Sequence, residues 1–161
     1  MAELIKVGMA DLKATKYPNF LITYGLGSCI GIALYDPINK IGGLAHIMLP
    51  DSNQARSSDN PAKFADTAIP LLINNMIKLG ASKSRIVSKI AGGAQMFSFT
   101  NTTDIMRVGE RNAEAVRTTL KKLEIRLLAD DTGGNYGRTV ELNLENGMFR
   151  IKSIDRAEKF I

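Results

Sequence analysis

Cys29 and His46, the only cysteine and the only histidine of the chain, are the residues best suited to nucleophilic chemistry. Cys29 lies in a glycine-rich stretch, residues 23–31, with the sequence TYGLGSCIG, and His46 lies in residues 42–50, GGLAHIMLP. A thiol becomes a good nucleophile near neutral pH when a nearby base takes its proton or a nearby charge lowers its pKa. The chemistry therefore depends on whether the fold brings this thiol and this imidazole together.

Two predicted strands, residues 29–35 and 41–49, contain the cysteine and the histidine. The residues between them, DPINK at 36–40, have the composition of a turn, because Asp, Pro and Asn each favour turn conformations. Two apolar strands joined by so short a turn predict a β-hairpin. The hairpin would carry the thiol on one strand and the imidazole on the other.

The register of this hairpin decides whether the two side chains meet. If Tyr35 pairs with Lys40, Cys29 lies directly opposite His46, and if Pro37 pairs with Lys40, the two are diagonal neighbours on the same face. Directly opposite residues have Cβ atoms about 4.5–5.5 Å apart, and diagonal neighbours are about 7–8 Å apart. A slip of one residue between these registers would place the two side chains on opposite faces of the sheet.

A buried and inert role is the alternative for both side chains. A lone cysteine is more often a small apolar core residue than a nucleophile, and a lone histidine on an apolar strand is more often structural than catalytic. Gly27 and Gly31 leave space around the thiol, which core packing alone does not require. The Gly25–Cys29 turn can also direct several backbone N–H groups at one point. With these features taken into account, the catalytic and the structural interpretations of the pair are about equally supported.

In the catalytic interpretation, His46 takes the proton of Cys29, or forms an ion pair with it, and the thiolate attacks a carbonyl carbon. The expected donors to the oxyanion are backbone N–H groups of Gly27, Ser28 and Cys29. The imidazolium then protonates a leaving amine, and water cleaves the thioester. Thr23 is the candidate for orienting the imidazole, since the hairpin itself contains no carboxylate for that role.

Length and composition limit the other function classes. The chain has 161 residues and a net charge of +5, and we expect a single domain over residues 1–161 with a loose tail over 154–161. Its basic residues are dispersed, which argues against nucleic-acid binding. One Cys and one His are a poor ligand set for a metal. No signal peptide or membrane-spanning apolar run is evident, so we expect a cytoplasmic protein without membrane insertion.

The remaining pattern predicts a mixed α/β domain of the α+β class. Helices are expected from an Asn60 cap to Leu79, with a kink or break at Pro70, and from Gly109 to Lys122. Asn146-Gly147 is a strong signal for a second hairpin. Further strands are expected over 4–9, 20–23, 86–90, 125–129, 139–144 and 148–154, and loops over 11–18, 51–60, 97–104 and 130–138. The hairpins argue against a purely parallel sheet.

Six blocks of the sequence, in order along nearly the whole chain, resemble the CheD family of chemoreceptor glutamine deamidases. The most specific is the Gly-Leu-Gly-Ser-Cys block followed by the histidine. The blocks are Thr23 with 25–29 (GLGSC), His46 with 49–50 (LP), 92–94 (GGA), 109–112 (GERN), 131–134 (DTGG) and 137–138 (GR).

The resemblance implies an enzyme of the bacterial or archaeal chemotaxis pathway. It would hydrolyse selected glutamine side chains of methyl-accepting chemotaxis receptors to glutamate, with release of ammonia and without a metal or organic cofactor. The family's catalytic residues correspond to Cys29, His46 and Thr23. The implied fold has packed mixed β-sheets flanked by helices and is similar to that of Cys–His toxin deamidases.

The resemblance also implies a protein partner. Family members bind CheC, a phosphatase of the phosphorylated chemotaxis response regulator, and raise its activity. A non-catalytic module that regulates CheC or the receptors by binding alone is therefore the alternative to an enzyme.

Overall fold

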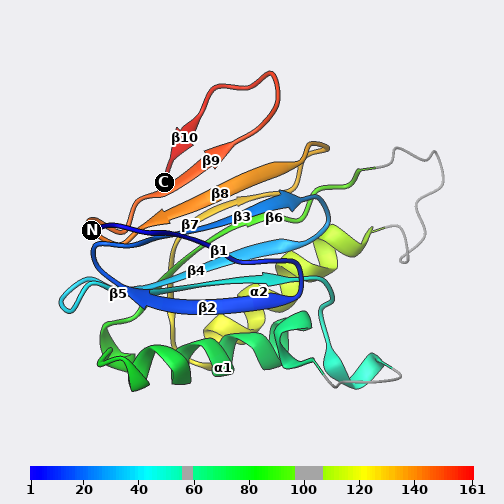
Figure 1. Ribbon diagram of the computed structural model, residues 1–161. Coiled ribbons are helices and arrows are strands. Elements are labelled where there is room, and N and C mark those ends of the chain that lie inside the picture. The colour runs from blue at the N-terminus through cyan, green and yellow to red at the C-terminus, as the bar shows by residue number, and fades with distance from the viewer. Residues whose placement is uncertain (56–59, 97–106) are drawn as a thin grey trace.

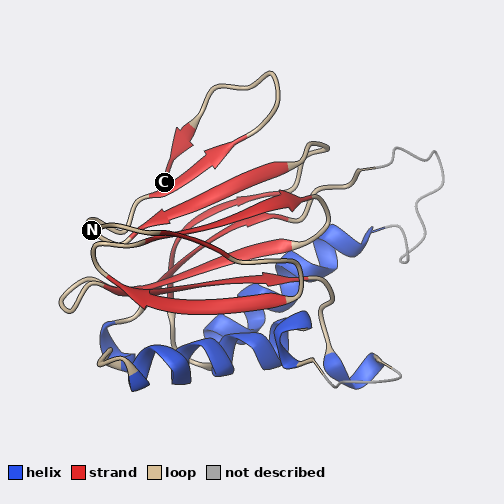
Figure 2. Ribbon diagram, viewed as in Figure 1, coloured by secondary structure: helices blue, strands red, loops and turns tan. Residues whose placement is uncertain are grey.

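The computed structural model of the protein describes residues 1–55, 60–96 and 107–161. Within these residues, two five-stranded sheets and two α-helices form three layers (Figures 1 and 2). Each sheet mixes parallel and antiparallel pairs. The α+β class predicted from the sequence is therefore confirmed. None of the helices in the described residues has the length and hydrophobicity needed to span a membrane.

The first sheet has the strand order β1-β3-β8-β9-β10, and the second has the order β2-β5-β4-β6-β7. The strands of the first sheet are β1 (Leu4–Lys6), β3 (Phe20–Leu26), β8 (Arg138–Asn143), β9 (Phe149–Lys152) and β10 (Lys159–Phe160). Those of the second are β2 (Asp11–Lys16), β5 (Ile41–Ile47), β4 (Ile30–Asp36), β6 (Val87–Gly92) and β7 (Arg126–Thr132). The helices are α1 (Ala65–Lys78) and α2 (Val108–Lys122), with short 3-10 turns η1 (Ser52–Gln54), η2 (Pro61–Lys63) and η3 (Lys83–Arg85).

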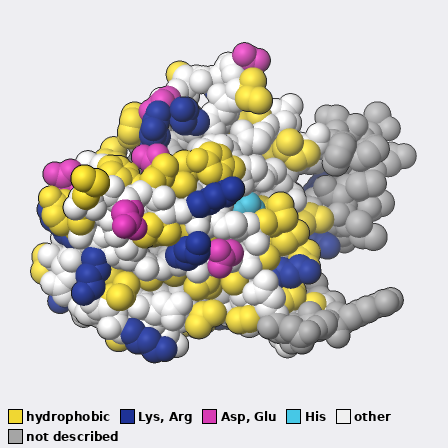
Figure 3. Space-filling view, in the orientation of Figure 1, with side chains coloured by type: hydrophobic (Ala, Val, Ile, Leu, Met, Phe, Trp, Pro, Cys, Tyr) yellow, Lys and Arg dark blue, Asp and Glu magenta, His cyan; other side chains and the backbone are white. Residues whose placement is uncertain are grey.

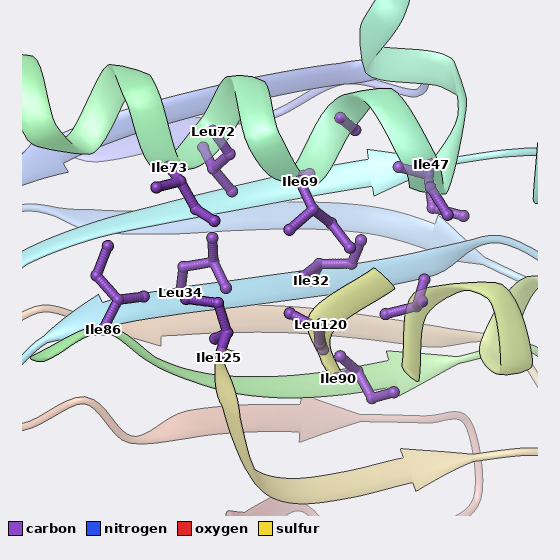
Figure 4. Close-up of a cluster of buried hydrophobic side chains, with 14 of the residues drawn as sticks. Ile32, Leu34, Ile47, Ile69, Leu72, Ile73, Ile86, Ile90, Leu120 and Ile125 are labelled. Carbon is purple, nitrogen blue, oxygen red and sulfur yellow. The ribbon is translucent and has the colours of Figure 1, made fainter. Parts of the chain in front are cut away.

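The second sheet forms the middle layer, with the helices on one face and the first sheet on the other (Figure 2). Strand β4 shows the alternation that this requires: Ile30, Ile32 and Leu34 join the core cluster shared with the helices, whereas Ala33 and Tyr35 join the cluster between the sheets. Figure 4 shows the helix-side cluster, in which the branched aliphatic side chains of α1 interlock with those of β4 and β5. A strand buried on both faces is apolar at successive positions, as the sequence of β4 is.

Two adjacent glycines of β5 allow both neighbouring layers to approach the middle sheet closely. A Cβ atom on Gly42 would lie 2.5 Å from a methyl carbon of Leu144, on the side of the first sheet. A Cβ atom on Gly43 would lie 2.6 Å from a methyl carbon of Leu72, on α1. The glycine pair therefore locks β5, the strand that carries His46, between the two layers.

The structure corrects the prediction of a loop over 11–18, which rests on the polar, turn-like composition of the segment. Residues 11–16 form β2, which pairs with β5 over the whole of its length. The strand is polar because it is an edge strand with only one neighbour in the sheet. Because of this pairing, Asp11 lies opposite His46 in the β2–β5 ladder.

The C-terminal segment also differs from its prediction as a loose tail. Residues 159–160 form β10, which pairs with β9, and the backbone of Ile161 exchanges two hydrogen bonds of 3.0 Å with Phe149. Arg150 and Glu158 form an ion pair next to this pairing. Backbone pairing of this kind carries little sequence signal in so short a strand.

The first helix starts later than predicted and is not divided. Asn60 and Pro61 cap the 3-10 turn η2, where Asn60 Oδ1 accepts a hydrogen bond from Ala62 N, and α1 begins at Ala65. The helix continues through Pro70, which the sequence predicts as a kink or break. Its buried face includes Ile69 and Leu72, which lie before and after the proline, and packs on the second sheet. The predicted loop over 97–104 lies outside the described residues.

Candidate active site

Cys29 lies where the chain crosses from the first sheet to the second. Strand β3 ends at Leu26, and β4 begins at Ile30, so the connection is 27–29. In the β4–β5 ladder Gly31 lies opposite His46, so the same register continued past the end of β4 makes Cys29 the diagonal neighbour of His46. Cys29 belongs to the cluster between the two sheets, and His46 faces the same side through its contact with Thr23. The hairpin therefore has the second of the two predicted registers, in which Pro37 faces Lys40.

His46 and Thr23 face each other across the two sheets and are in direct contact. His46 Nδ1 lies 2.8 Å from Thr23 Oγ1, and the Thr23 hydroxyl donates a hydrogen bond of 2.8 Å to the main-chain oxygen of Val7. All three residues are at most 1% exposed. The residue predicted to orient the imidazole is therefore hydrogen bonded to it.

The Val7 carbonyl determines which ring nitrogen of His46 carries the hydrogen of the neutral imidazole. A carbonyl oxygen only accepts hydrogen bonds, so the single hydroxyl proton of Thr23 is used in the bond to Val7. Thr23 Oγ1 must then accept a proton from His46 Nδ1, which places the hydrogen of the neutral ring on Nδ1. Nε2 is left with a free lone pair. It is buried and has no hydrogen-bond partner among the described residues.

Burial favours the neutral forms of both side chains. Burial lowers the pKa of His46 below its ordinary value, because an imidazolium loses its hydration there. Burial raises the pKa of the Cys29 thiol, an effect that the backbone N–H of Cys29 partly offsets. These directions favour a neutral thiol and a neutral imidazole that carries a basic Nε2.

The carbonyl groups of the cysteine loop are held from outside the site. Ala94 N donates to Gly27 O at 2.8 Å, and Gly93 N donates to Cys29 O at 2.9 Å. In each peptide unit the N–H points opposite to the carbonyl, so these bonds also fix the directions of the Ser28 and Ile30 N–H groups. The predicted use of this loop as an oxyanion site stays a prediction.

The site lies just beneath the molecular surface. Cys29 is 8% exposed and His46 1% exposed. Figure 3 shows a small part of the only histidine (cyan) at the surface, between basic and hydrophobic side chains. On the cysteine side, the half-exposed side chain of Met96 lies over Gly27, where a Cβ atom would be 3.2 Å from Met96 Cγ.

Two contacts of the site escaped the sequence analysis. The Val7 carbonyl has no side-chain signal, because any residue at position 7 would supply it. Asn112 on α2 is fully buried and donates to the main-chain oxygens of Ser28 and Met48. Its signal in the sequence is the block 109–112, which the family resemblance includes without a role. In the described residues, no three His, Cys, Asp or Glu side chains gather as metal ligands.

Comparison with known proteins identifies relatives of the whole chain. A family model described as CheD chemotactic sensory transduction matches residues 48–153. The probable chemoreceptor glutamine deamidase CheD of Caldanaerobacter subterraneus subsp. tengcongensis is 54% identical over 160 residues, which cover 99% of each chain. The proteins of the same name from Lachnoclostridium phytofermentans and Desulfitobacterium hafniense are each 53% identical over 161 residues, the full length of both chains. These full-length matches span the positions of Thr23, Cys29 and His46, which the family model does not reach.

Proposed function

The chain belongs to the CheD family, and on that premise we propose that it is a protein-glutamine deamidase of chemotaxis receptors. It hydrolyses glutamine side chains of methyl-accepting receptors to glutamate and releases ammonia, and it does so in the cytoplasm. The names of the relatives support the reaction and the class of substrate. The single observation in the structure that carries the proposal is His46 Nε2, which is buried without a partner among the described residues on the side between the sheets where Cys29 also lies.

The proposed reaction begins with proton transfer from the Cys29 thiol to His46 Nε2. The thiolate attacks the carboxamide carbon of the glutamine, and the imidazolium passes its proton to the leaving nitrogen, so that ammonia departs and a thioester remains. Water, deprotonated by the same imidazole, then cleaves the thioester to glutamate and the free thiol. The pKa directions of both groups support a transfer during the reaction rather than a resting ion pair.

Thr23 holds the imidazole in the form that this reaction needs. With its proton fixed on Nδ1 by Thr23 Oγ1, the ring presents Nε2 as the base. When Nε2 takes the thiol proton, the bond to Thr23 is retained, because Nδ1 remains a donor. Backbone N–H groups of Gly27, Ser28 and Cys29 are the proposed donors to the oxyanion of the tetrahedral intermediate.

The decisive experiment incubates receptor with the protein and measures each receptor glutamine by mass spectrometry. Conversion of Gln to Glu adds about one dalton, and ammonia release is measured in parallel. We expect conversion with the wild-type protein and none with Cys29→Ala, because no other thiol is present. Conversion by a folded Cys29→Ala protein would disprove the cysteine mechanism, and no conversion by the wild type would disprove the function.

We further propose that the protein binds the CheC phosphatase and stimulates it, as the family membership implies. The Cys29→Ala variant separates this role from catalysis. Retained binding and stimulation in that variant would show that the partner function does not need the reaction. If the wild type bound CheC and converted no receptor glutamine, the chain would be the non-catalytic binding module.

A further inference from the structure

The amide nitrogen of the Asn112 side chain donates both of its hydrogens to main-chain carbonyls of the site. Nδ2 donates to Ser28 O at 2.9 Å and to Met48 O at 3.0 Å, and the side chain is fully buried. Ser28 precedes Cys29, and Met48 follows His46 by two residues. One carboxamide therefore connects the segment of the nucleophile with the segment of the base.

These bonds lie where the pairing of β4 with β5 ends. The last pair of the ladder is Ile30 with Ile47, and the same register continued by one residue would place Met48 opposite Cys29. At that position the backbone of Met48 takes another partner, because its N–H donates to Lys63 O at 2.8 Å. The carboxamide thus joins the two chain segments just beyond the last rung of the ladder.

We propose that Asn112 is a positioning residue that holds the Cys29 peptide unit against the end of β5. The inference rests on the proposed function, since it assigns the residue a part in that reaction. The Ser28 carbonyl and the Cys29 N–H belong to one planar peptide unit and point in opposite directions. By holding the carbonyl, Asn112 directs the Cys29 N–H away from α2 and fixes a proposed donor to the oxyanion.

The orientation of the carboxamide follows from its partners. Two carbonyl oxygens require donors, so Nδ2 must face them, and Oδ1 then points elsewhere. Oδ1 is buried and has no partner among the described residues. A buried acceptor without a partner destabilises the fold, so an apolar side chain of similar size would be tolerated better if packing were the only demand. The two donated bonds are therefore the contribution that only a carboxamide makes here.

Gly109 brings Asn112 into range. The two residues are three apart on α2 and lie on the same face of the helix. A Cβ atom on Gly109 would lie 2.6 Å from the carbonyl oxygens of Gly93 and Ala94, so any side chain there would push α2 away. Gly93 and Ala94 are the residues that donate to the cysteine loop. The helix start and the loop form one packed unit, and Asn112 reaches the site from it.

The test compares Asn112→Asp and Asn112→Leu with wild type, and with Asn74→Asp at an exposed position of α1 as the matched control. The aspartate keeps the shape but presents an acceptor to two carbonyls, and the leucine removes the donors without adding charge. The measurements are kcat and KM for receptor deamidation and the pH profile of Cys29 alkylation by iodoacetamide.

We expect kcat to fall about 100-fold in both variants while KM changes less than about threefold, because a mispositioned oxyanion donor acts on the transition state. Alkylation needs no oxyanion donor, so its rate at neutral pH falls only about tenfold, with the midpoint of its pH profile displaced. The control stays at the wild-type values. Folded variants with wild-type kcat and an unchanged pH profile would overturn the proposal, even if their thermal stability were reduced.

Two further measurements test the proposal if the variants do not fold or if the wild type is inactive. If neither variant folds, Cys29 of the wild type is alkylated with iodoacetamide and the side-chain amide signals of Asn112 are followed by NMR. The proposal expects these signals to shift, and unchanged signals would overturn it. If the wild type deamidates no receptor, the proposed function fails, whereas the alkylation profile still decides whether Asn112 positions Cys29.

Discussion

The two faces of the second sheet are both buried, but they differ in the polar group that one of them holds. Toward the helices, β4 and β5 present large aliphatic side chains such as Ile32, Leu34 and Ile47, which are completely buried against α1 and α2 (Figure 4). Toward the first sheet, β5 presents His46, whose Nε2 is buried without a partner among the described residues. Both faces bury apolar side chains, and the face toward the first sheet also holds this unpaired nitrogen.

This difference indicates that the helix face of β4 and β5 mainly stabilises the fold, whereas the face toward the first sheet also serves the chemistry. Close aliphatic packing on the helix side stabilises the fold through burial of apolar surface. An unpaired polar atom on the other side costs stability, and such a cost persists where chemistry uses the atom. We therefore expect substitutions on the site face to change activity more than stability, and substitutions on the helix face to do the reverse.

The largest effect is expected for His46→Asn on the site face. The asparagine carboxamide can keep an N–H toward Thr23, while the base at the Nε2 position is removed. General-base catalysis contributes about 100- to 10,000-fold, so we expect kcat for deamidation to fall by about that factor. Thermal unfolding of the variant should remain within a few degrees of wild type. A variant with near-normal kcat would remove His46 from the reaction and leave the two faces without their functional contrast.

Leu72→Ala tests the helix face. Leu72 is completely buried and lies against Gly43 of β5, so its truncation leaves a cavity. Such truncations cost about 2–5 kcal/mol of unfolding free energy. We expect that loss in denaturant titrations, with kcat per folded molecule close to wild type well below the melting temperature. Leu128→Ala, at a half-exposed position of β7, is the control of matched chemistry. A large loss of kcat in folded Leu72→Ala would show that helix packing, too, positions the site.

A smaller effect is expected for Thr23→Val, which preserves shape and removes the hydroxyl between His46 and Val7. The Nδ1–H and the Val7 carbonyl then lack partners, at a cost of about 1–3 kcal/mol, which corresponds to about 5- to 150-fold in kcat if it falls on the reactive form. Thr23→Ser keeps the hydroxyl and should restore most of the rate. The ¹⁵N spectrum of the single histidine should show the Nδ1–H form in wild type and a mixture in Thr23→Val. A valine variant with wild-type kcat would leave Thr23 a structural role only.

The sequence predicts the local part of this arrangement. The turn over 36–40 restricts the hairpin to a few registers, and one of the two that keep Cys29 and His46 on the same face is present. The Asn146-Gly147 turn likewise predicts the β8–β9 hairpin, and Gly147 has the positive φ of 76° that favours glycine. These features depend on residues close together in the chain, where turn chemistry and strand periodicity act directly.

The contacts that the sequence could not predict join distant parts of the chain. The Val7 carbonyl and the Asn112 carboxamide reach the site from other layers, and β2 has the polar composition of a turn because only one of its edges is paired. Long-range packing decides such contacts, and no periodicity within one chain encodes which segments will adjoin. The family resemblance includes the block 109–112 but assigns Asn112 no task, which the structure supplies.

The smallest effect concerns pH and compares the two faces within one protein. Burial lowers the pKa of His46 in the folded state, so below the ordinary histidine pKa of about 6.5 the unfolded chain binds a proton there more readily than the folded chain does. The unfolding free energy therefore falls as the pH falls below that value, by at most about 1.4 kcal/mol for each pH unit until the folded protein also takes up the proton. Above it, both states are neutral at this residue and the effect is absent.

His46→Asn removes this titrating group, whereas Leu72→Ala leaves it in place. Denaturant titrations between pH 5 and 8 should show a shallower pH dependence for His46→Asn and the wild-type slope for Leu72→Ala. Equal slopes in all three proteins would mean that the site face does not hold its imidazole neutral.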